Sequence, residues 1–178
     1  MGLQLIFVVE SDKKCKSDWI YIRDTIEHFY SYDQAHTRFS QVYMDGKGNY
    51  DRSKTKGEIE SYVSQYENKK NPSANRSVVV YCFDCDDYDS KPEDLAFLNA
   101  AQQYCVEQGH EFIWFCKDVE RVYLGQEVSK GQKNKEAVTF RTKKLIGQID
   151  EKRLQIDRFR ANTSNIMCVL DKYLERKQ

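Results

Sequence analysis

The fold is decided by two apolar runs, Leu3–Val9 (LQLIFVV) and Ser77–Phe83 (SVVVYCF), which are followed directly by Glu10 and Asp84. Short apolar runs rich in β-branched and aromatic residues are typical of strands buried on both faces, as in the interior of a parallel sheet. Both runs end at a carboxylate. The sequence therefore predicts two central strands that each present an acidic side chain where the strand ends.

Outward from these runs, strand and helix patterns alternate through roughly the first 116 residues. Further strands are predicted at 38–44 and 111–116, and helices at 18–30, 58–67 and from Pro92 to a C-cap at Gly109. We expect Ser17 or Asp18 to cap the first helix, and Asn71-Pro72-Ser73 to break the chain. The alternation predicts a Rossmann-like α/β fold with a mainly parallel four-stranded sheet flanked by helices.

The chain changes character after residue 125. Residues 1–125 are predicted to form the α/β domain, and residues 126–178 a basic, mostly helical C-terminal extension packed on the same domain. Within this part, 125–134 predicts a surface loop. An apolar face over 165–176 predicts a last helix, which Thr163 or Ser164 would cap.

The charge is balanced overall but not along the chain. The 28 Lys and Arg equal the 28 Asp and Glu, which excludes a uniformly basic nucleic-acid binder. Residues 130–160 nevertheless hold ten basic and four acidic side chains, a net charge of +6. Residues 161–178 add +1, so residues 1–129 carry −7. A basic stretch of this kind is most often a solvated helix face.

Composition also limits where the protein is expected to act. At 40% hydrophobic residues the chain is not a disordered tail. No apolar run approaches the roughly 18 residues of a membrane span, and the strand-like start lacks a signal peptide's basic region. We therefore expect a cytoplasmic protein with no membrane partner, whose six cysteines are reduced thiols.

Acidic residues gather where the predicted strands end. Glu10 follows the first strand, and Asp84 and Asp86 follow the third; on an extended chain, residues two apart share a face. Carboxylates brought to one edge of a parallel sheet suit Mg²⁺ or Mn²⁺. Asp118 and Glu120, after the fourth strand, either extend this metal site or begin a helix whose dipole they favour.

These residues carry a resemblance to a known family. Leu-Ile-Phe-Val-Val-Glu10 and Val-Val-Tyr-Cys-Phe-Asp84-Cys-Asp86 resemble the Toprim fold of topoisomerases, primases and small nucleases, and most closely the RloB-like and abortive-infection nucleases of bacteria. The lysine-containing loop after Glu10, the acidic and aromatic residues at 115–124 and the Asn-Thr-Ser-Asn at 162–165 are similar to that family as well. The match spans most of the chain.

The resemblance implies a Toprim-like, Mg²⁺- or Mn²⁺-dependent endonuclease with a place in phage defence. It assigns metal binding and catalysis to Glu10, Asp84 and Asp86, with Glu10 as general acid or base. Its predicted phosphate contacts are Lys13, Lys14 and Lys16, and the +6 segment would follow a nucleic-acid backbone. The implied partners are DNA or RNA, together with a partner ATPase or a second copy of the chain.

Among the alternative functions, one remains open and the others are not supported by the sequence. Ser11 stands where the family has Gly, which keeps open a Toprim-like module that binds nucleic acid or regulates without cutting. Asp-x-Asp glycosyltransferases usually need a longer chain, and dehalogenase-like phosphatases carry Asp-x-Asp on their first strand. P-loop and dinucleotide-binding glycine motifs are missing from the sequence. Cys82 and Cys85 form a single C-x-x-C without the second pair that a zinc ribbon needs.

Overall fold

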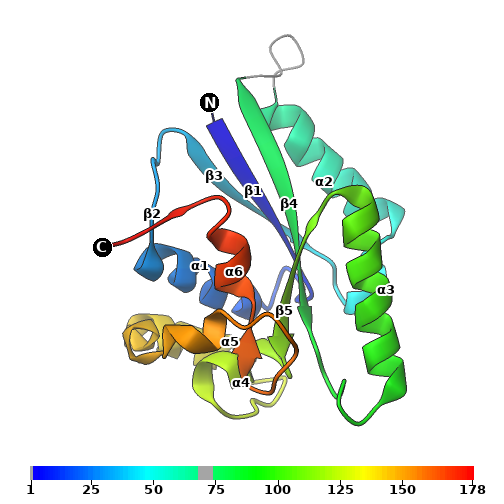
Figure 1. Cartoon of the computed structure of the whole chain (residues 1–178), viewed down its shortest axis with the longest axis vertical. Coiled ribbons are helices and arrows are strands. Elements are labelled where there is room, and N and C mark those ends of the chain that lie inside the picture. Colours follow the sequence, from blue (N-terminus) through cyan, green and yellow to red (C-terminus); the bar gives the residue numbers. More distant parts are fainter. Residues whose placement is uncertain (1, 68–73) are drawn as a thin grey trace.

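The computed structural model describes residues 2–67 and 74–178; the predicted chain break at 71–73 lies outside them. Within these residues, five strands form a central sheet in the order β3-β1-β4-β5-β6 (Figure 1). The strands are β1 (Gly2–Val9), β3 (Thr37–Tyr43), β4 (Asn75–Asp84), β5 (Glu111–Cys116) and β6 (Thr163–Ser164). The first four are parallel to one another, as the sequence predicts, and β6 pairs with β5 in the antiparallel direction.

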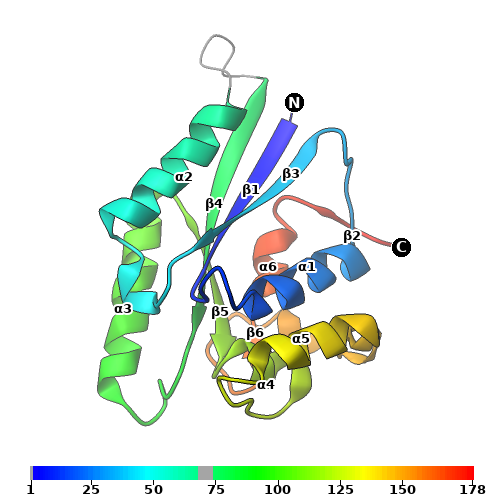
Figure 2. The same ribbon diagram turned by 180° about the vertical axis from the view of Figure 1, so that it is seen from behind.

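Helices cover both faces of this sheet. Side chains alternate along β1, so that Leu5, Phe7 and Val9 enter one core while Ile6 and Val8 enter the other. The first core is closed by α1 (Ser17–Phe29), α4 (Val119–Leu124), α5 (Lys133–Thr142) and α6 (Ile166–Leu170). The second is closed by α2 (Ser53–Tyr66) and α3 (Pro92–Gln108) (Figures 1 and 2). Burial on both faces explains why the central strands are mainly apolar.

The connections leave the two central strands toward opposite faces. The chain passes from β1 into α1 on one side of the sheet, and from β4 into α3 on the other, although β1 and β4 are paired neighbours. The carboxyl ends of β1 and β4 therefore border a topological switch point, where open α/β sheets bind their ligands. Gly109, with φ +68°, ends α3 in the left-handed conformation, as predicted.

The start of α1 differs from the prediction. Lys16 occupies the N-cap position without a capping side chain, and Ser17 is the first helical residue. The Asp18 carboxylate accepts a hydrogen bond from the backbone N–H of Ser11 at 3.0 Å instead. It thereby fixes the loop between β1 and α1 rather than capping the helix. The second helix also begins earlier than predicted, at Ser53, after a short 3-10 turn at Lys47–Asn49 (η1).

The last predicted helix is wrong in length. The helix α6 ends at Leu170, and the chain then turns into β7 (Glu175–Arg176), which pairs with β2 (Tyr30–Ser31). Asp171 stabilises the turn, because its carboxylate accepts hydrogen bonds from the Tyr30 hydroxyl and the Arg176 guanidinium, each at 2.7 Å. These long-range contacts override the helical pattern of 165–176.

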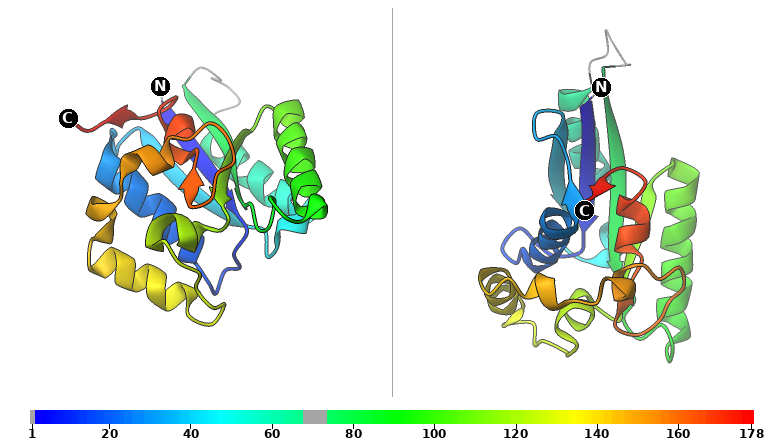
Figure 3. Two further views of the ribbon diagram at one scale, coloured as in Figure 1. Left: turned by 60° about the horizontal axis from the view of Figure 1, so that its bottom comes forward. Right: turned by 60° about the vertical axis from the view of Figure 1, so that its left-hand side comes forward.

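Residues 126–178 are built into the body of the fold. The helix α5 packs along α1, as Figure 3 shows, and β6 extends the central sheet. Short 3-10 turns, η2 (Leu145–Gln148) and η3 (Glu151–Leu154), connect them. All six cysteines are free thiols. Within the described ranges, none of the helices has both the length and the apolar character that crossing a membrane requires.

Asn165 completes the edge of the sheet beyond β6. Its Oδ1 accepts the backbone N–H of Trp114 and its Nδ2 donates to the carbonyl of Phe112, both at 2.9 Å. The Ser164 hydroxyl donates to the Trp114 carbonyl at 2.6 Å and accepts the N–H of Ile166, so neither predicted cap residue acts as the N-cap. One side-chain amide thus satisfies β5 backbone groups as a neighbouring strand would.

Replacing Asn165 by Ala is expected to lower the free energy of unfolding by about 2–3 kcal/mol, because two half-buried backbone groups lose their partners. The measurement is urea unfolding followed by circular dichroism. Asn134→Ala, at an exposed position of α5, is the matched control and should change stability by less than about 0.5 kcal/mol. Equal stability of the two variants would contradict the role assigned to Asn165.

Candidate active site at the carboxyl ends of β1 and β4

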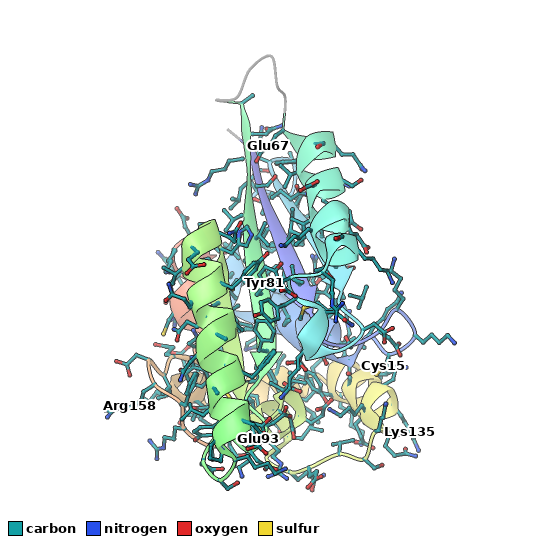
Figure 4. All side chains as sticks on the ribbon, turned by 90° about the vertical axis from the view of Figure 1, so that its right-hand side faces the viewer. Cys15, Glu67, Tyr81, Glu93, Lys135 and Arg158 are labelled. Carbon is teal, nitrogen blue, oxygen red and sulfur yellow. The ribbon has the colours of Figure 1, made fainter. Side chains whose placement is uncertain are left out.

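A cleft of about 480 Å³ lies at the switch point between β1 and β4. Its floor holds Glu10 and Asp84, and the loop between β1 and α1 forms one wall. Asp45 and Gly46, after β3, and Lys130 and Lys133, before and at the start of α5, complete the lining. Figure 4 shows the loop with Cys15 and the beginning of α5, marked by Lys135, on the same side of the molecule. The cleft is therefore built from four separate parts of the chain.

Glu10 and Asp84 are held together by hydrogen bonds. The Oε1 atom of Glu10 accepts the backbone N–H of Asp84 at 2.8 Å, and the Glu10 carbonyl accepts the N–H of Gly46 at 3.0 Å. Oδ1 of Asp84 accepts the N–H of Val119, the first residue of α4, at 3.0 Å. Each carboxylate thus has one oxygen anchored to the backbone.

The environment of this pair disfavours negative charge. Burial raises the pKa of Glu10 to about 8, against the hydrogen bond from the Asp84 N–H, and repulsion from Asp18 and Asp86 adds to the rise. Burial, followed by repulsion from Glu10, also raises the pKa of Asp84 well above its ordinary value. Two neighbouring carboxyl groups whose ionisation is disfavoured by burial and by nearby carboxylates are typical of a functional site.

Asp86 does not share the face of Asp84. The strand β4 ends at Asp84, and Asp86 has a positive φ of +47°, so the extended geometry assumed from the two-residue spacing is absent. The chain turns because the N–H groups of Cys85 and Asp86 bond to the carbonyls of Phe115 and Lys117. The Asp86 carboxylate pairs with Lys47, which also contacts Asp94 at 3.1 Å. Asp86 therefore lies outside the lining of the cleft.

The carboxylates that face the cleft suit a hard divalent cation. Across residues 2–67 and 74–178, no group of three or more His, Cys, Asp or Glu is arranged to hold a metal ion. Mg²⁺, however, usually takes only one or two carboxylates and completes its shell with water and substrate phosphate. Glu10 and Asp84 supply such a pair, with raised pKa values that a cation would relieve. The donor set fits Mg²⁺ or Mn²⁺.

The predicted phosphate-contacting lysines lie at the rim. Lys13, Lys14 and Lys16 are exposed, and Lys13 pairs with Glu58 at 3.3 Å. The loop is shaped by Asp12, whose Oδ1 accepts the N–H groups of Lys14 and Cys15, both at 2.7 Å. The structure thus places these lysines on the outer side of the loop whose other residues line the cleft.

The two acidic residues after β5 have different environments. Asp118 is the N-cap of α4 and accepts the Arg121 N–H at 2.8 Å, which confirms the helix-starting alternative for this residue. Glu120 is fully buried and pairs with Lys133 at 2.8 Å. Its raised pKa is due first to burial, which the Lys133 ammonium opposes.

Two residues of the site were missed from sequence. Asp18 approaches the floor of the cleft from α1, and Lys133 approaches it from α5. The sequence marked Asp18 only as a helix start, and Lys133 only as one of ten basic residues in a polar stretch. Asp18 reaches the cleft through its hydrogen bond with the Ser11 N–H, and Lys133 reaches it through packing of α5 on α1.

A scan against protein-family models and searches of curated proteins and of solved structures found no match for this chain. The relation to the Toprim family therefore stays a prediction from the sequence.

The raised pKa of Glu10 predicts how stability depends on pH. A carboxyl group whose pKa rises from 4.5 in the unfolded chain to about 8 in the folded protein binds protons more tightly when folded. The stabilisation of the folded protein by this tighter proton binding is fully present below pH 4.5 and is lost as the pH rises toward 8. In EDTA, we expect wild-type protein to lose on the order of 2 kcal/mol between pH 5 and pH 8 relative to Glu10→Gln.

Urea unfolding at both pH values measures this difference. Glu60→Gln, which changes an exposed carboxylate on α2, should follow the wild type at each pH. A Glu10→Gln curve parallel to that of the wild type would show that Glu10 is ionised at pH 7 in the folded protein.

Proposed function

We propose that this protein is a metal-dependent phosphodiesterase that cleaves nucleic acid, with Glu10 and Asp84 as its metal-binding carboxylates. The observation that carries the proposal is their position. Two desolvated carboxylates from neighbouring parallel strands meet at a topological switch point, in a cleft that Lys130 and Lys133 also line. Carboxylates beside lysines suit a substrate that is bound through a cation and through its own negative oxygens.

Glu10 and Asp84 would hold Mg²⁺ or Mn²⁺, which supplies Lewis-acid stabilisation of the charge developing on the phosphate. Oε1 of Glu10 is anchored, so its other oxygen, Oε2, would either complete the metal shell or serve as general acid or base. Asp84 holds the start of α4 through Oδ1 and presents Oδ2 to the cleft. Lys13, Lys14 and Lys16 contact phosphates beyond the rim.

The wider assignment follows the sequence resemblance. It comprises a Toprim-like fold, a cytoplasmic site of action, a role in phage defence, DNA or RNA as substrate, and a partner ATPase or a second copy of the chain. The competing function is a Toprim-like module that binds nucleic acid or regulates without cutting. The pairing of Glu10 with Asp84 favours the enzyme, because nucleic-acid binding by itself has no use for desolvated carboxylates facing a polyanion.

The test incubates the protein with supercoiled plasmid and with single-stranded RNA, in Mg²⁺, in Mn²⁺ and in EDTA. We expect cleavage of at least one substrate with metal and none with EDTA. Glu10→Gln and Asp84→Asn should reduce the cleavage rate at least ~100-fold, because each removes a negative ligand of the metal.

Asp89→Asn is the matched control, since Asp89 lies in the loop after β4 and pairs with Lys117 at 3.0 Å outside the cleft. Asp86→Asn decides the place of the third predicted carboxylate. In the observed geometry we expect this variant to keep most of the activity, whereas a loss equal to that of Asp84→Asn would assign Asp86 to the metal. Binding without cleavage, unchanged in all variants, would contradict the proposal and support the binding module.

A further inference from the structure

An ion pair lies beside the carboxylates of the cleft. The side chain of Glu120 is fully buried, and its Oε2 accepts a hydrogen bond from the Lys133 ammonium at 2.8 Å. Its Oε1 is buried without a hydrogen-bond partner in the described part of the chain. Lys133 keeps 27% of its side chain exposed and lines the cleft with Glu10 and Asp84. One end of the pair is thus inside the protein, and the other faces the site.

This ion pair is expected to contribute little to the stability of the folded protein. A buried carboxylate with one unsatisfied oxygen pays a desolvation cost that a single lysine does not fully offset, and an apolar pair of similar size is often at least as stable. The effect of the pair is to fix the position of the Lys133 ammonium. Glu120 is fully buried on α4, so its contact fixes where the flexible lysine side chain ends.

Packing holds both partners in place. Tyr21 of α1 stacks on Tyr123 of α4 with ring centroids 5.0 Å apart, and meets Phe140 of α5 at 5.1 Å. Lys133 begins α5, and Glu120 lies one turn before Tyr123 on α4. The aromatic contacts therefore set the distance between the two short helices and the position of the ammonium over the cleft.

The ammonium faces an excess of negative charge. Burial favours neutral Lys133, but Asp84 and Glu120 outweigh burial and raise its pKa, with a further contribution from Asp18. Glu120 and Asp18 in turn both raise the pKa of Asp84, and Lys133 lowers it. Lys133 is therefore a cation that acts on Asp84, one of the two carboxylates that a divalent cation would bind.

We propose that Lys133, positioned by Glu120, is a fixed cation beside the Glu10–Asp84 pair that opposes metal binding and that binds a substrate phosphate once a divalent cation is present. This inference rests on the proposed function. It assigns to the cleft a second, built-in cation, which Glu120 holds at 2.8 Å and which a phosphate oxygen can approach from the cleft. Lys133 is the phosphate ligand, and Glu120 is a positioning residue that touches neither metal nor substrate.

The two roles predict effects of opposite sign. A fixed positive charge near a metal site repels the metal, so removing it should tighten metal binding while weakening phosphate binding. Removing the negative charge of Glu120 leaves the lysine charge uncompensated, so metal binding should weaken. A lysine that only stabilised the fold would move both affinities in the same direction.

The experiment titrates each protein with Mn²⁺ and follows free Mn²⁺ by electron paramagnetic resonance. We expect the Kd for Mn²⁺ to fall about threefold in Lys133→Met and to rise about threefold in Glu120→Gln. Fluorescence anisotropy then measures binding of a labelled single-stranded DNA with Ca²⁺ in place of Mg²⁺. Its Kd should rise about tenfold in Lys133→Met. Lys135→Met, at an exposed position of the same helix, is the control for both measurements.

The results separate this inference from the proposed function. Wild-type protein that binds no Mn²⁺ and cleaves nothing overturns both. Wild-type protein that binds Mn²⁺ and cleaves, with Lys133→Met indistinguishable from Lys135→Met, overturns only the role of Lys133. If Lys133→Met does not fold, Glu120→Gln still tests the inference, since unchanged or tighter Mn²⁺ binding in that variant contradicts it.

Discussion

The pairing of β1 with β4 is the constraint on which the rest of the molecule depends. Both strands are buried on both faces, so helices must cover each side of the sheet. Because the strands are parallel neighbours whose connections leave to opposite sides, their carboxyl ends open a cleft that neither connection closes. Glu10 and Asp84 stand where these strands end, and a hydrogen bond across the strand pair locks them together. The pairing of the two strands therefore sets the position of both carboxylates.

The sequence was sufficient for features that arise from local patterns. Apolar runs marked three of the four parallel strands, and a more polar run at 38–44 marked the fourth. The residue that follows the first and third strands located Glu10 and Asp84. The two-residue spacing gave a wrong orientation for Asp86. Hydrogen bonds to carbonyls of β5 and of the loop after β5 turn the chain after Asp84. The apolar pattern of 165–176 predicted a helix that is too long, because tertiary contacts of Asp171 end the helix early. Lys133 was beyond prediction, since only the packing of α5 on α1 brings it to the cleft, and the place of Asp18 depends on a hydrogen bond with Ser11 that the sequence does not show.

The split between an acidic first part and a basic last part of the chain has a structural counterpart. The acidic part supplies the floor of the cleft, and the basic part supplies Lys130 and Lys133 at its wall. The rest of the basic segment is not gathered there, since Lys135 and Arg158 appear on opposite sides of the molecule in Figure 4. The contribution of the segment to the site thus depends on two lysines in particular positions more than on its total charge.

The location of β6 and α5 late in the chain has a consequence for synthesis. A ribosome releases β1, β4 and their carboxylates well before it releases Lys133, and the edge of β5 stays open until Thr163 to Asn165 emerge. β7 then pairs with β2, the strand that directly follows α1. The loop before α1 forms one wall of the cleft. A nascent chain consequently carries the acidic pair before its cationic neighbour is made. Under the proposed function, such a chain has the carboxylates for a metal but lacks the lysine for a substrate phosphate.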